Sequence, residues 1–107
     1  MRLDAVIAPV LPATLHLPNS VVRSLGGLRE YCEVRRYRGA GLGFLTRLKK
    51  SLGDAGVPCH QWQGSLVLTF PSLEARAETW TAITGKLRPA FLSYEFAVYE
   101  HRETPLT

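Results

Sequence analysis

The segment at residues 91–101 (FLSYEFAVYEH) constrains the fold more than any other part of the chain. Its many aromatic and β-branched residues favour a strand, in which successive side chains point to opposite faces. One face is apolar and carries Leu92, Tyr94, Phe96 and Val98. The other face is mixed and carries Phe91, Ser93, Glu95, Ala97 and Tyr99. A strand that is largely apolar on both faces needs a cover over each of them.

The length and composition of the chain are typical of one soluble domain. It has 107 residues, of which 46% are hydrophobic and 21% are charged, and its net charge is +4. No apolar run approaches the ~20 residues that span a bilayer, so we expect no membrane partner. The first residues lack the pattern of a signal peptide, which predicts a cytoplasmic protein.

Six segments show the periodicity of strands or helices. In order, they predict a strand at residues 28–38, a helix at 43–55, two strands at 57–62 and 65–70, a helix that stops at Gly85, and a strand at 91–101. This is the βαββαβ order of a ferredoxin-like fold, an α+β fold whose antiparallel sheet carries both helices on one face. The apolar face of the last strand is then expected under the helices. Its mixed face becomes either a dimer interface or a pocket wall.

Local signals define several ends and faces of these elements. The pair Gln63–Gly64 predicts a tight hairpin turn in which the glycine takes a positive φ. Ser72 is the expected N-cap of the second helix, and Trp80 lies on its inner stripe. Arg76 lies at the margin of that stripe, where we expect its stem to pack and its charge to reach water.

Residues 1–27 precede this pattern and form a predicted N-terminal extension to the ferredoxin-like domain at residues 28–107. Within the extension, Leu3–Val10 favours a strand that Pro9 and Pro12 restrict to a sheet edge. Asn19–Leu25 favours a short helix, capped by the side chain of one of its first two residues.

The two cysteines, Cys32 and Cys59, are expected to be reduced in a cytoplasmic chain. In a ferredoxin-like sheet, the first and second strands, where these cysteines lie, are separated by the third. We therefore expect no disulfide between them.

The chain after Gly27 resembles the dimeric α+β barrel superfamily, and within it the NIPSNAP-like and antibiotic-biosynthesis-monooxygenase-like proteins. Two motifs carry this resemblance: EVRRYR at residues 33–38 with the helix GFLTRLKKSL at 43–52, and FPSLEAR at 70–76 with Trp80 further along the helix. The resemblance implies a homodimer in which two sheets pack face to face. It also implies a small apolar or aromatic ligand, and a cofactor-free oxygenase or isomerase reaction.

Pocket-lining candidates follow from the aromatic and titratable residues on these elements. His60 and Tyr37 are the candidates for a catalytic base or hydrogen-bond donor. The further candidates for the pocket lining are Trp62, Trp80, Tyr94 and Tyr99. The same residues are also typical of ordinary core packing, so the sequence leaves open whether the protein is an enzyme. The histidines have no metal-ligand spacing, and we expect no metal or cofactor.

A basic stretch in the first half of the chain supports an alternative function. It contains Arg35, Arg36, Arg38, Arg47, Lys49 and Lys50. Such a cluster is found on surfaces that bind nucleic acid or an acidic protein, and also on ordinary solvated helix faces. A third interpretation is a structural or regulatory subunit in which residues 1–27 dock onto a partner.

Overall fold

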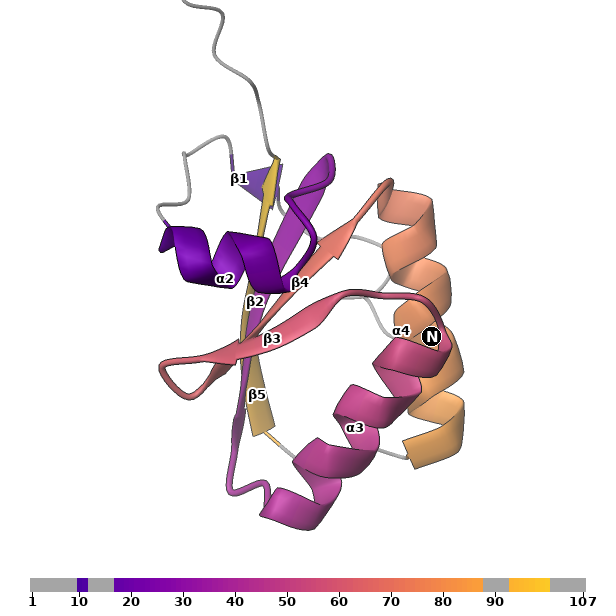
Figure 1. The fold of residues 1–107 in the computed structure, drawn as a ribbon. Helices are drawn as coiled ribbons and strands as arrows, with labels where there is room; N and C mark the ends of the chain where they lie inside the picture. Colours follow the sequence, from indigo (N-terminus) through magenta and orange to yellow (C-terminus); the bar gives the residue numbers. More distant parts are fainter. Residues whose placement is uncertain (1–9, 12–16, 88–92, 101–107) are drawn as a thin grey trace, which may run out of the picture.

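The computed structural model of the protein describes residues 10–11, 17–87 and 93–100. The elements in these residues are β1 (Val10–Leu11), α2 (Asn19–Ser24), β2 (Tyr31–Arg38), α3 (Leu42–Asp54), β3 (Cys59–Trp62), β4 (Ser65–Phe70), α4 (Leu73–Leu87) and β5 (Ser93–Glu100). The chain therefore has an α+β fold, and the predicted succession of strand, helix, two strands, helix and strand is found from β2 to β5 (Figure 1).

One sheet joins all five strands in the order β1-β5-β2-β4-β3. The four strands β3, β4, β2 and β5 are antiparallel, and β1 adds a short parallel pairing to the outer edge of β5. In the central register, Val34 lies between Val67 of β4 and Ala97 of β5. In the extension, the structure describes the two-residue edge strand Val10–Leu11, while residues 3–9 of the predicted strand lie outside the described part of the chain.

The two long helices cover one face of the sheet, and α2 lies on the opposite face (Figure 1). The larger core forms between the sheet and the long helices from Leu48, Leu52, Val57, Leu66, Leu68, Phe70, Trp80 and Ile83. A smaller core forms under α2 from Val21, Leu25, Cys32 and Val67. The extension thus supplies part of the cover for the second face, which the two-helix pattern alone would leave bare.

The β3–β4 hairpin and the start of α4 follow their sequence signals. Gln63 and Gly64 have φ angles of 51° and 77°, so both turn residues are left-handed, as the predicted tight hairpin requires. The N–H of Ala75 donates to Ser72 Oγ at 3.1 Å, which confirms Ser72 as a helix cap.

Several predicted boundaries are wrong by a few residues. Helix α4 continues through Gly85 to Leu87, because one glycine inside a helix costs only about 1 kcal/mol. Strand β3 begins at Cys59, since the N–H of Val57 is still bonded to Leu52 O (2.9 Å) at the end of α3. No side chain caps α2, whose N-cap position is Pro18. Residues 91, 92 and 101 of the predicted last strand lie outside the described residues.

Cys32 and Cys59 are both free, and β4 lies between their strands. The expected placement of the two cysteines on strands that are separated by a third strand is confirmed. In the described parts of the chain, no helix is long and apolar enough to cross a membrane.

The docking of α2 can be tested with one aspartate on each side of the helix. We expect Val21→Asp to lower the free energy of unfolding by about 3 kcal/mol, because Val21 is only 2% exposed and an unpaired carboxylate would be buried there. Urea unfolding followed by circular dichroism measures this. Ser20→Asp, on the exposed side of the same helix, is the control and should change stability by less than about 0.5 kcal/mol. Equal losses in both variants would show that α2 is not docked.

Candidate functional site

A buried carboxylate holds together the sheet and helix α4. Glu33, on β2, is fully buried and accepts three hydrogen bonds from charged or aromatic donors. Its Oε1 accepts from Arg76 Nε at 2.6 Å and from Trp80 Nε1 at 2.8 Å. Its Oε2 accepts from Arg35 Nε at 2.8 Å. One side chain of β2 thus binds two side chains of α4, four residues apart on one helix face.

Aromatic rings enclose the Arg35 guanidinium on the helix side of the sheet. Its central carbon lies 3.6 Å from the ring centroid of Trp80 and 4.5 Å from that of Tyr94, distances typical of cation–π contacts. The Tyr37 hydroxyl accepts a hydrogen bond from Arg35 Nη1 at 3.3 Å. Burial by itself would lower the pKa of Arg35, but Glu33 and Tyr37 together raise it, so the guanidinium stays charged.

This cluster corrects two expectations about arginines. Arg35 is only 2% exposed and therefore does not belong to a basic surface. Arg76 is 1% exposed, and its charge is bonded to Glu33 rather than to water. The role of Glu33 was not predicted from the sequence, because a charged residue on a strand is usually exposed to solvent. A signal was present, since Glu33 and Arg35 lie between Tyr31 and Tyr37 on one face of the strand.

The buried and exposed ion pairs allow a matched stability test. We expect Glu33→Gln to lower the free energy of unfolding by about 3–5 kcal/mol, because it removes the buried carboxylate charge that two buried guanidinium groups contact. The control, Glu95→Gln, removes the partner of Arg38 in a pair whose side chains are 69% and 60% exposed. It should cost less than about 1 kcal/mol. Chemical denaturation of both variants measures the difference, and a small loss in both would contradict the anchoring role of Glu33.

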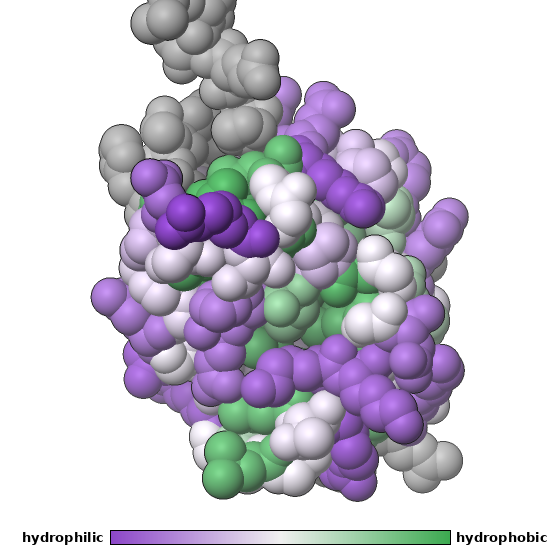
Figure 2. All heavy atoms as spheres, viewed as in Figure 1, coloured by the Kyte–Doolittle hydropathy of each residue, from purple (hydrophilic) through white to green (hydrophobic). Residues whose placement is uncertain are grey.

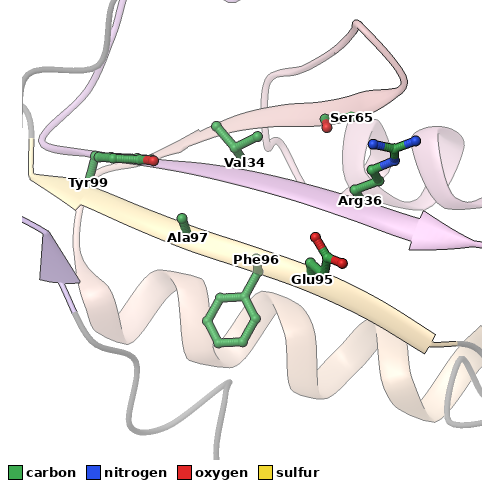
Figure 3. Close-up of a pocket in the computed structure, with 7 residues that line it drawn as sticks. All are labelled: Val34, Arg36, Ser65, Glu95, Phe96, Ala97 and Tyr99. Carbon is green, nitrogen blue, oxygen red and sulfur yellow. The ribbon is translucent and has the colours of Figure 1, made fainter.

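A shallow depression lies on the opposite face of the sheet, beside α2. We call the part of this face that is formed by β2 and β5 and carries the depression the open half of the sheet. Its volume is about 280 Å³, and its lining is Val34, Arg36, Ser65, Glu95, Phe96, Ala97 and Tyr99. Figure 3 shows Arg36 and Glu95 close together at one end, Tyr99 at the other end, and Val34 and Ala97 between them. Phe96 points to the other side of the sheet, toward the long helices.

The depression has a polar end and an apolar end. A second hollow of about 420 Å³ adjoins the polar end and shares Arg36 and Glu95 with it. Arg38 Nη2 donates to Glu95 Oε1 in an exposed ion pair. The sheet backbone under Val34 and Ala97 forms the floor of the apolar end. Such an arrangement can hold a small molecule that has a polar group at one end.

The structure divides the six aromatic and histidine candidates between the two faces. Tyr37, Trp80 and Tyr94 lie on the helix side, around Arg35. His60, Trp62 and Tyr99 lie on the face of α2, because their register partners Val67, Ser65 and Cys32 point there. Tyr99 lines the depression, while Trp62 packs against the core under α2.

The division also separates the two candidates for catalysis, since the sheet lies between His60 and Tyr37. Burial raises the pKa of Tyr37 above its ordinary value, although the charge of Arg35 opposes this. The Tyr37 hydroxyl therefore stays protonated near neutral pH and is poorly suited to act as a base. Across the described residues, no three side chains of the metal-binding types His, Cys, Asp and Glu gather closely enough to hold a metal ion.

The other predicted basic residues lie on separate surfaces. Arg36 and Arg38 are exposed on the open half of the sheet. The exposed basic residues of α3 are Arg47, Lys49 and Lys50. Lys49 Nζ reaches Gln61 Oε1 on the edge strand β3 at 3.3 Å. In Figure 2, hydrophilic side chains extend across α3 and β3 and over α2, with apolar residues between them. A single continuous basic face is therefore not formed by these residues.

Both thiols are protonated at neutral pH. Burial raises the pKa of Cys32 to about 12, and the charge of Glu33 adds to this effect. Burial raises the pKa of Cys59 to about 11, and Lys49 opposes the change. Neither cysteine has the lowered pKa that a nucleophilic thiol needs.

The raised pKa values predict a loss of stability in alkali. A thiol with a folded pKa above its ordinary value of 9.0 stabilises the fold fully below pH 9, and this contribution is lost as the pH rises toward 12. Between pH 8 and pH 10 we expect Cys32→Ala to lose about 1 kcal/mol less stability than the unaltered chain. Urea titrations at the two pH values measure this. Identical pH dependence in both proteins would contradict the shifted pKa of Cys32.

Comparison with known proteins adds no relative: no family model, curated protein or solved structure matches the chain. The resemblance to the dimeric α+β barrel superfamily therefore stays a prediction.

Proposed function

We propose that this protein binds a small aromatic or apolar molecule on the open half of its sheet. The observation that carries the proposal is the depression with an apolar floor at Val34 and Ala97, a tyrosine ring at one end and charged groups at the other. Ligand sites in proteins are commonly concave, mainly apolar and supplied with a few polar groups that orient the ligand. The volume of about 280 Å³ is close to the lower end of the range for ligand pockets, which suits a small ligand.

The helix side of the sheet is less suited to this role. The aromatic side chains there already enclose the Arg35 guanidinium, and Glu33 already accepts three hydrogen bonds. A ligand would have to displace these contacts and leave buried charges without partners, at a cost of several kcal/mol. Among the described residues, the exposed pair of Arg38 and Glu95 is the one ion pair on the open half that a ligand could disturb.

We also propose that the domain is ferredoxin-like. The strand order β5-β2-β4-β3 supports this, with α3 and α4 on one face. One chain is sufficient for the proposed binding site, because all residues that line the depression belong to it. A sheet-to-sheet dimer stays a prediction, and α2 would have to lie at its rim because this helix covers part of the face concerned. We propose binding rather than oxygenation, since neither His60 nor Tyr37 lines the depression.

Two lysine substitutions on β5 test the binding site. With 2-naphthol as a neutral aromatic probe, we expect amide chemical-shift changes in NMR spectra to centre on Val34, Ala97 and Tyr99. Ala97→Lys fills the floor of the depression and should weaken binding by about tenfold or more, roughly 1.4 kcal/mol. Ser93→Lys is the matched control, because Ser93 is exposed on the same face of β5 but does not line the depression.

Two results would contradict this function. The first is a change in amide chemical shifts on the helix side of the sheet when the probe is added. The second is an Ala97→Lys variant that binds the probe as tightly as the Ser93→Lys control and the unaltered chain do. Either result would show that the open half is not the binding site.

A further inference from the structure

Arg36 has an unusual electrostatic position on the open half of the sheet. In the register of β2 and β5 it lies directly opposite Glu95, where opposite charges ordinarily pair across two strands. Glu95 Oε1 instead accepts from Arg38, two residues further along β2. Within the described part of the chain, no hydrogen bond or ion pair engages the Arg36 guanidinium.

The Arg36 side chain lies at the polar end of the depression, near Ser65 (Figure 3). A guanidinium is planar and matches the two oxygens of a carboxylate, and a serine hydroxyl can donate a further hydrogen bond. Beyond this end, the floor is apolar and ends at the Tyr99 ring. The surface thus offers an anion receptor in line with an apolar platform.

We infer that the ligand of this site is an organic acid, with a carboxylate bound by Arg36 and an aromatic or apolar body lying over Val34 and Ala97. Ser65 is a second donor to the carboxylate. Arg38 is a positioning residue, because its ion pair with Glu95 keeps that carboxylate from neutralising Arg36. This inference rests on the proposed function and specifies the chemical class of the ligand.

Three probes with one ring system separate the charge of the ligand from its apolar body. They are 2-naphthoate, neutral 2-naphthol and the cation 2-naphthylmethylammonium, each titrated into the full chain and followed by NMR. We expect the acid to bind about fivefold more tightly than the alcohol, the size of effect that an exposed charge pair gives, and the cation to bind most weakly. The preference for the acid should decline as salt is added, because salt screens exposed charges.

Variants then test the roles of the two arginines. Arg36→Gln should remove the preference for the acid without changing the affinity for the alcohol. Arg47→Gln, on the exposed side of α3, removes the same charge elsewhere and should leave the preference intact. Arg38→Gln should also weaken binding of the acid, since it frees Glu95 to pair with Arg36. Adding Glu95→Gln to Arg38→Gln should restore the acid preference, which a merely structural role of Arg38 would not predict.

The outcomes distinguish the two proposals. If the acid and the alcohol bind the depression equally and Arg36→Gln changes neither affinity, the inference is overturned while the proposed function stands. If no probe shifts the amides of the depression, both are overturned. If Arg36→Gln abolishes the preference but the Arg38→Gln/Glu95→Gln pair does not restore it, the positioning role of Arg38 is overturned.

Discussion

The buried carboxylate of Glu33 is the interaction on which the arrangement of this domain depends. It joins β2, in the middle of the sheet, to α4 through Arg76 and Trp80, and it holds Arg35 against the aromatic rings on the same side. A buried carboxylate with two arginines tolerates little displacement, because any lost partner leaves a charge in an apolar surrounding. The position of α4 over the sheet is therefore specified by directional bonds as well as by apolar packing.

This use of charge on the helix side is the reason why the proposed binding site lies on the opposite face. The aromatic side chains of Tyr37, Trp80 and Tyr94 are engaged by Arg35, so the face that is richest in aromatic residues is not the face that is free. On the opposite face, α2 covers Cys32 and Val67 and leaves the neighbouring surface of β2 and β5 open. Helix α2 thus covers the part of this face that lies next to Val34, which also lines the depression.

The sequence predicted much of the fold, because the signals involved are local. The stripe of α3, the Ser72 cap and the left-handed turn at Gln63–Gly64 each depend on residues a few positions apart. The same reasoning identified the mixed face of the last strand as a dimer interface or a pocket wall, and Glu95, Ala97 and Tyr99 do line the depression. It failed for Arg35 and Arg76, whose burial depends on a carboxylate 43 residues away from Arg76 in the chain.

By itself, the sequence determined the order of the elements and the helix-facing side of β5, since periodicity and turn chemistry act over short distances. Only the tertiary structure decided which charged residues are buried and which aromatic residues share a face. The physical reason is that a charge is stable in a protein interior only when specific partners surround it. Those partners come from β2, α4 and β5, and folding alone brings them together around Glu33 and Arg35.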